Sequence, residues 1–394
     1  MKKIILIFIM LCSLEFYHLA FIPETIVKAI ELTGLGTLLV FFVLYMVYGE
    51  KSTIRKRFLF PVILFFIASV LAMIGAYVCN DQKFINSLYA ERAVYFYLVY
   101  FLLHAMKIET RFIVRVAVAF GVFYILLYFI QYFIYPVRIT SSPIRVDRET
   151  LRIWLDGFGY LVIAYYIWLN RAASDFKWKY VLLLMLSLGV YIMMGTRQIL
   201  AVILLLSLLY LFQSRVIRSK LLIFLMFAAG AVAAFFIFED IILAMFQQTL
   251  EQSGNLEGSI RLRAIDFFMT RFYGNKLAYF TGNGVSYSSV YELRTMKYEQ
   301  QYGFFVHDIG LVGEYFNYGA VYVVGALLIL YKAIRAKLPE EFIFARYHFI
   351  AILLTVITAG GSFVSFGESI FLNCLIFYVI DREAVERSEE RIIS

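Results

Sequence analysis

Residues 58–79 read FLFPVILFFIASVLAMIGAYVC, an uninterrupted apolar run without a single charged side chain. As an α-helix this run would be about 33 Å long, enough to cross the roughly 30 Å hydrocarbon core of a bilayer. The whole chain has the same character, because 62% of its residues are hydrophobic, 16% are charged and the mean hydropathy is +0.80. Soluble domains are less apolar and more charged. The sequence therefore predicts a membrane protein that crosses the bilayer many times.

Similar apolar runs recur along the chain. We predict an all-α polytopic fold of about twelve transmembrane helices, in which residues 1–394 form one integral membrane domain. The predicted spans are 4–22, 27–48, 58–79, 89–106, 112–135, 153–169, 180–194, 199–212, 221–238, 305–331, 343–362 and 364–380. The first run lacks a small-x-small cleavage site before Pro23, so we expect it to be retained as a span.

The net charge of +8 is spread over short loops and forms no continuous basic face, so nucleic acid is not an expected partner. If the N-terminus lies inside, inner segments carry 22 of the 36 Lys and Arg residues and outer segments carry 14. Six of the outer 14 lie in one long loop, which the positive-inside rule weights less. The distribution predicts that both termini are cytoplasmic, with 381–394 as a solvated tail.

Two outer segments carry most of the features that point to function. Residues 239–304 form a long loop, rich in glycine and tyrosine, between the ninth and tenth spans. Residues 136–152 contain four arginines. Outer segments hold ten Arg against four Lys, whereas inner segments hold twelve against ten. Because a guanidinium group binds phosphate oxygens bidentately, this excess favours a phosphate ligand, with anchoring to lipid headgroups as the alternative.

The candidate phosphate-binding residues are Arg197, Arg261, Arg263, Arg145, Arg148 and Arg152. Arg197 lies in the sequence GTRQ, residues 195–198, which forms the whole link between two spans and predicts a tight turn. The alternative for this turn is a capping threonine followed by an arginine that reaches back to the interface. Arg261 and Arg263 straddle one residue, so they would share a ligand only if a helix begins between them.

The tenth span opens with YGFFVHDIGLVGE, residues 302–314, which contains the candidate catalytic residues His307, Asp308 and Glu314. In a continuous helix, His307 and Glu314 would share a face about 10 Å apart along the axis. Ionisable groups just below the membrane surface are functional candidates, and the alternative is a buried pair satisfied by neighbouring hydroxyls and water. The outer segments contain no His or Cys pair at metal-ligand spacing, so neither a metal nor a cofactor is expected.

These elements together resemble the membrane glycosyltransferases of the O-antigen polymerase and O-antigen ligase superfamily over residues 180–380. The resemblance is carried by the arginine-bearing turn, the long outer loop with paired arginines, Gly282-Asn283-Gly284, and His307-Asp308 at the entry of the next helix. The chain departs from the family pattern by a threonine in place of serine before Arg197. It departs again by an aspartate in place of asparagine after His307.

The resemblance implies a GT-C-like transferase in the bacterial inner membrane that takes a glycan from an undecaprenyl-pyrophosphate carrier on the periplasmic face. We expect polymerisation of lipid-linked oligosaccharide repeat units of O-antigen or a related surface polysaccharide. His307 would act as the base or would position the acceptor, tuned by Asp308 and Glu314. The arginines would bind the pyrophosphate without a metal. The expected partners are the lipid-linked donor and acceptor, membrane lipid and a chain-length regulator protein. An O-antigen ligase acting on lipid A–core is the first alternative, and a flippase or other transporter of lipid-linked glycans is the second. An accessory scaffold without activity is the third.

Overall fold

The computed structural model describes residues 1–48, 54–147, 150–213, 259–356 and 360–384, together with Glu239 and Leu243. The chain is a mostly helical membrane protein. Within the described ranges four helical segments are long and apolar enough to cross a bilayer. They are α2 (Glu24–Tyr48), α3 (Leu59–Asn80), α6 (Thr110–Ile134) and Val306–Arg335, the segment that contains α15 (Gly310–Arg335).

Shorter helices lie at most of the other predicted spans. They are α1 (Lys2–Ser13), α5 (Leu98–Met106), α7 (Phe158–Ser174), α8 (Trp178–Met193), α9 (Arg197–Gln213), α16 (Phe344–Thr355) and α17 (Gly367–Glu383). The predicted span 221–238 and tail residues 385–394 lie outside the described residues. A helix of 12 residues, such as α1 or α16, rises only about 18 Å and is shorter than the bilayer core.

The first predicted span, 4–22, is wrong beyond Ser13. Four consecutive residues, Glu15 to His18, have positive φ angles between 46° and 59°, so the chain turns sharply instead of continuing as a helix. The Tyr17 side chain is buried in this turn, and the His18 imidazole lies 3.2 Å from the Asp156 carboxylate. Hydropathy cannot detect such a turn, because the contact that stabilises it comes from a residue far along the chain.

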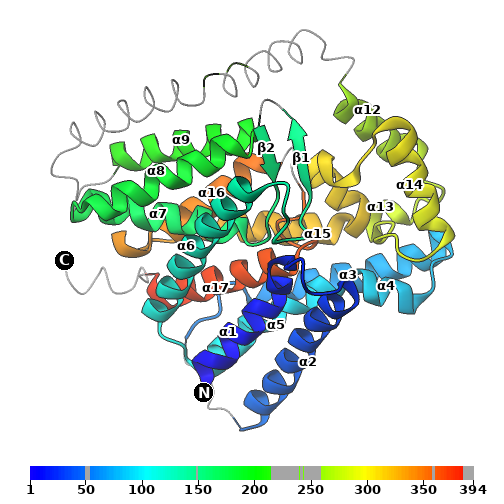
Figure 1. The fold of residues 1–394 in the computed structure, drawn as a ribbon. Helices are drawn as coiled ribbons and strands as arrows, with labels where there is room; N and C mark the ends of the chain where they lie inside the picture. Colours follow the sequence, from blue (N-terminus) through cyan, green and yellow to red (C-terminus); the bar gives the residue numbers. More distant parts are fainter. Residues whose placement is uncertain are drawn as a thin grey trace.

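Helix α17 lies at the centre of the helix assembly (Figure 1). Every residue from Ile370 to Ile380 is buried, and α17 contacts α1, α5, α6, α7 and α16. Helices α7, α8 and α9 lie side by side, and α15 packs along α3 (Figure 1). The central position explains why the 364–380 segment is apolar on all sides.

Several segments predicted to face the cytoplasm meet at one end of the helix assembly, which we call the basic end. The Lys2 ammonium group donates to the Met106 carbonyl oxygen at 3.1 Å. The Arg57 backbone N–H donates to Asp381 at 3.0 Å, and Lys332 donates to the Arg57 carbonyl oxygen at 2.7 Å. These contacts join the N-terminus, the end of α5, the start of α3 and the ends of α15 and α17.

A two-stranded hairpin interrupts the predicted all-helical fold. Strand β1 (Ile144–Asp147) pairs antiparallel with β2 (Thr150–Ile153), and Arg145 lies opposite Arg152. The hairpin follows α6, whose first residue Thr110 hydrogen-bonds to Glu383 at the basic end. Since α6 is 25 residues long, the hairpin lies at the opposite end of the assembly.

The described part of the predicted long loop, residues 259–304, is largely helical. It contains α12 (Ile260–Asp266), α13 (Ala278–Thr281) and α14 (Val290–Tyr302), which lie together beside α4 (Phe84–Ala90) at the right of Figure 1. Residues of α12, of α14, of the segments that follow them and of the start of α15 form a small buried cluster that is mostly aromatic: Ala264, Phe268, Phe272, Tyr291, Phe304, Ile309 and Phe316. Residues 259–304 are therefore a packed part of the protein that covers the start of α15.

Candidate functional site

The hairpin docks on the end of α8, directly before the Arg197 turn. Arg152 donates from Nε to the Met194 carbonyl oxygen at 2.8 Å, and the Thr150 hydroxyl donates to the Met193 carbonyl oxygen at 3.1 Å. The guanidinium groups of Arg152 and Arg145 lie 4.6 and 5.7 Å from the Trp154 ring centre. The hairpin arginines therefore lie next to the turn that carries Arg197. Cation–π contacts with Trp154 orient Arg145 and Arg152.

The link from α8 to α9 is a tight turn, as predicted. Helix α8 ends at Met193 and α9 begins at Arg197, while Gly195 takes the positive φ of 61° that the reversal needs. The Arg197 side chain is half-buried. Next to it, Gln198 donates from Nε2 to the carbonyl oxygens of Leu354 and Thr355 at 3.2 and 3.4 Å. The turn is therefore tied to the end of α16.

The chain that follows α16 is tied in turn to the His307 segment. The Leu311 N–H donates to the Val356 carbonyl oxygen at 2.7 Å, and the Gly360 N–H donates to the His307 carbonyl oxygen at 3.1 Å. Among the described residues, hydrogen bonds thus link the hairpin to the Arg197 turn, the Arg197 turn to the end of α16, and residues 356 and 360 to the His307 segment. Three sequence-predicted elements, more than 150 residues apart at their extremes, lie at the same end of the fold.

His307 and Asp308 lie in a short 3-10 turn, Val306–Ile309, and both side chains are exposed. The His307 ring lies 6.4 Å from the Phe366 ring, measured between centres. Gly310, with φ 57° and ψ −134°, separates this turn from α15. The prediction that His307 and Glu314 share one face of a continuous helix is therefore wrong, because the helix begins only at Gly310.

Glu314 is buried, with 3% of its surface exposed. Its carboxylate accepts hydrogen bonds from the Tyr322 hydroxyl and from the Gly361 N–H, the latter at 2.6 Å. These partners fit the alternative interpretation, in which neighbouring groups satisfy the buried carboxylate. Through Gly361, Glu314 holds the segment whose Gly360 N–H donates to the His307 carbonyl oxygen.

Three of the candidate arginines remain, Arg148, Arg261 and Arg263, and the structure describes the last two. Helix α12 packs against the His307 turn and carries Arg261 and Arg263, both exposed. The helix begins at Ile260, before both residues, so the two side chains leave the axis about 200° apart. Arg261 and Arg263 would share a ligand only if a helix began between them, and it does not. One of the two can still face the His307 turn. Arg148 lies outside the described residues.

The Gly282-Asn283-Gly284 motif packs against a break in α15. Gly319 has φ 73° within that helix, and the N–H groups of Asn283 and Gly284 donate to the carbonyl oxygens of Phe316 and Asn317 at 2.8 and 2.9 Å. A Cβ atom on Gly282 would lie 2.2 Å from the Asn317 oxygen. The glycines are required by this close approach of two backbones.

A charged cluster at the end of α1 was not predicted. The His18 Nε2 atom lies 3.4 Å from Glu15 and 3.2 Å from Asp156, while Arg92 donates to the buried Glu31 at 2.6 Å. Only Glu15 stands out in the sequence, as an acid within an apolar run. His18 lies in the same turn as Glu15. Glu31, Arg92 and Asp156 come from three further segments, so no local pattern could have connected them to this turn. Within the described ranges, no group of three or more His, Cys, Asp or Glu residues is arranged to hold a metal ion.

Comparison of the chain with known proteins does not identify a family for it. No family model matches the chain. No curated protein matches it either. The residues and their geometry therefore carry the functional argument.

Proposed function

We propose that the protein is a metal-independent membrane glycosyltransferase that polymerises undecaprenyl-pyrophosphate-linked oligosaccharide repeat units. The observation that carries the proposal is the meeting of the hairpin arginines, the Arg197 turn and the His307 turn at one end of the fold. Arginines suit a pyrophosphate, and an exposed imidazole beside them suits a proton acceptor. The resemblance to O-antigen polymerases and ligases, seen in the sequence, supports the same assignment.

The proposal includes a GT-C-like arrangement of about twelve spans in the bacterial inner membrane, with both termini in the cytoplasm. Helices at most of the predicted span positions support the number of spans. The gathering of Lys2, Arg57 and Lys332 at one end supports the orientation, because positive residues favour the cytoplasmic side. The end that holds Arg197 and His307 then faces the periplasm.

In the proposed reaction, a hydroxyl of the acceptor glycan attacks the anomeric carbon of the donor. The new glycosidic bond forms as the bond to the pyrophosphate oxygen breaks. His307 accepts the hydroxyl proton, and Asp308 lies next to it at the exposed turn. The departing pyrophosphate gains negative charge, which fixed guanidinium groups can stabilise. Arg197 and one of Arg261 or Arg263 would bind it, with Arg145, Arg148 and Arg152 as a second bank.

A ligase would use the same chemistry with lipid A–core as the acceptor, so it stays the first alternative. A transporter is the second, because transporters often place ligands at breaks in helices. Here the carbonyl oxygens at the α15 break accept hydrogen bonds from Asn283 and Gly284. A ligand would have to displace these partners, which favours the transferase over the transporter.

Deletion of the gene in the source bacterium, read on a lipopolysaccharide gel, tests the proposal. Loss of a polymerase leaves core that carries a single repeat unit. Loss of a ligase leaves bare core while lipid-linked polymer accumulates, and loss of a flippase leaves neither polymer nor single repeat. Only the first pattern, restored by the plasmid-borne gene, supports the proposed activity.

A further inference from the structure

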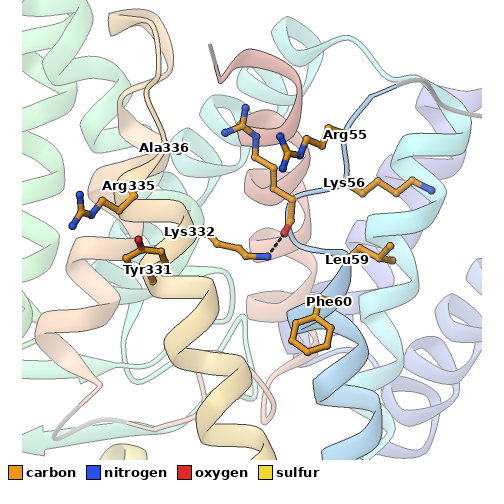
Figure 2. Close-up of a pocket in the computed structure, with 9 residues that line it drawn as sticks. Arg55, Lys56, Leu59, Phe60, Tyr331, Lys332, Arg335 and Ala336 are labelled. Atoms are coloured by element: carbon orange, nitrogen blue, oxygen red, sulfur yellow. Dashed lines mark hydrogen bonds between the residues drawn. The ribbon is translucent and has the colours of Figure 1, made fainter. Parts of the chain in front are cut away.

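A pocket of about 460 Å³ lies at the basic end, between the start of α3 and the end of α15. Its lining residues are Arg55, Lys56, Arg57, Leu59, Phe60, Tyr331, Lys332, Arg335 and Ala336. Five of these nine are lysine or arginine, and none is acidic (Figure 2). The volume is in the range of small-ligand sites, so the pocket is large enough for a headgroup-sized anion.

The antiparallel packing of two spanning helices brings these cations together. Residues 55–57 directly precede α3, and Lys332 and Arg335 lie in the last turn of α15. Three residues apart on a helix, Lys332 and Arg335 lie on neighbouring positions of one face. Lys332 donates to the Arg57 carbonyl oxygen at 2.7 Å, the bond drawn in Figure 2, which holds the two helix ends at this spacing.

An acidic group behind the pocket, Asp381, is already bound by protein donors. Its Oδ1 accepts from the Arg57 backbone N–H at 3.0 Å, and its Oδ2 accepts from the Tyr100 hydroxyl at 2.5 Å. The His104 Nε2 atom lies 3.1 Å from the same Oδ2. Asp381 bonds to the backbone N–H of Arg57, whereas the Arg57 guanidinium group donates to the Ala384 carbonyl oxygen at 3.1 Å, so the described lining of the pocket stays strongly positive.

The apolar side of the pocket continues onto exposed helix surface. Phe60 is 57% exposed and Tyr331 is 61% exposed, although both belong to helices long enough to span the membrane. Figure 2 shows Phe60 below the basic side chains, along α3. The Arg335 guanidinium lies 5.6 Å from the Tyr331 ring centre. A ligand with an anionic head and an apolar tail matches this change from basic to apolar lining.

We propose that this pocket binds the phosphate group of an anionic lipid headgroup, with the acyl chains along Phe60 and Tyr331. Clusters of lysine and arginine at the cytoplasmic ends of spanning helices attract anionic phospholipids. A soluble phosphate ester would offer the same phosphate chemistry without the tail. The exposed apolar side chains favour the lipid as the source.

Native mass spectrometry of the full-length protein, titrated with phosphatidylglycerol or with phosphatidylcholine of the same acyl chains, tests the proposal. The variant Lys56→Gln/Arg335→Gln removes two charges from the pocket and keeps the Lys332–Arg57 hydrogen bond. We expect phosphatidylglycerol to bind this variant about tenfold more weakly than wild type. The control Arg111→Gln/Arg115→Gln removes two charges from exposed positions near the start of α6 and should change binding less than twofold.

Equal losses in the two double variants, or equal binding of both lipids to wild type, would overturn the proposal. A third titration uses glycerol 3-phosphate as a soluble probe. If it binds wild type as tightly as the lipid does, and the pocket variant loses it, the lipid source is refuted and a soluble ester takes its place. Thermal unfolding checks that each variant is folded, and the single changes Lys56→Gln and Arg335→Gln replace the double variant if it is not.

Discussion

The Nε atom of Arg152 lies 2.8 Å from the carbonyl oxygen of Met194, three residues before Arg197. This hydrogen bond connects β2 to the α8–α9 turn across 42 residues of sequence. The Thr150 hydroxyl adds a second contact to the preceding carbonyl, that of Met193. The hairpin and the turn are therefore held together, and a ligand bound by Arg197 would lie close to the hairpin arginines.

Replacing Arg197 with lysine should abolish chain growth although the charge is kept. A lysine is a point charge and cannot form the two parallel hydrogen bonds of a guanidinium with a pyrophosphate. We expect a loss of about 10²–10³ in rate, measured with purified protein and a lipid-linked repeat unit. Arg115→Lys, an exposed residue on α6 near its start, is the matched control and should retain wild-type rate. Wild-type polymerisation by Arg197→Lys would contradict the assigned role.

His307→Ala should reduce the rate by about 10²–10⁴ without reducing the amount of folded protein in the membrane, because it removes the proposed base. The control is Gln300→Ala, an exposed residue on α14, which should leave the rate unchanged. His104 and His348 do not serve as controls, since both are buried and hydrogen-bonded, to Asp381 and Asn373. Activity of His307→Ala within a few-fold of wild type would show that the imidazole is not the base.

Chain growth should not depend on a divalent metal, because arginines are proposed to stabilise the leaving pyrophosphate. Purified protein incubated with EDTA should keep its polymerisation rate, and added Mg²⁺ or Mn²⁺ should not raise it. A metal-dependent glycosyltransferase assayed in parallel confirms that the chelation is complete. Activity that EDTA removes and Mg²⁺ restores would refute the arginine mechanism.

Gly319→Ala should destabilise the fold. The added Cβ would lie 2.1 Å from the Phe280 carbonyl oxygen, and the φ of 73° is unfavourable for any residue with a side chain. We expect the free energy of unfolding to fall by about 1–3 kcal/mol, so that the detergent-purified variant unfolds at a lower temperature than wild type. Gly36→Ala on α2, where no atom of the described residues lies within 4 Å of the added Cβ, should unfold at the wild-type temperature or above it. Equal unfolding temperatures for the two variants would argue against the packed crossing at Gly319.

Cysteines introduced at Ser141 and Ser288 should react only from the periplasmic side. Both positions are exposed in loops at the end of the fold that holds the hairpin and the 259–304 segment. Arg111→Cys, near the start of α6, should react only from the cytoplasmic side. Cys12 and Cys374 are buried, and the partly exposed Cys79 is first changed to serine. Labelling of Ser141→Cys from the cytoplasm would invert the proposed topology and remove the argument for a periplasmic site.

The contacts within the candidate site show where prediction from the sequence stops. The tight turn before Arg197 follows from the shortness of the GTRQ link, and the structure confirms it. The break at Gly310 does not follow, because an apolar run with a glycine is equally compatible with a continuous helix. The partners of Glu314 lie 8 and 47 residues away, and no periodicity connects them.

The sequence by itself determined that this is a helical membrane protein, and it placed most of the helices. Hydropathy is a local property of about 20 residues, so a prediction of spanning helices from it does not depend on how the rest of the chain folds. The tertiary structure decided that the hairpin docks on Met194 and that the end of α16 contacts both the Arg197 turn and the start of α15. It also decided that Arg55 and Arg335 line one pocket. Such contacts depend on how apolar helices pack, and helices that are apolar on all sides carry no periodic signal of their neighbours.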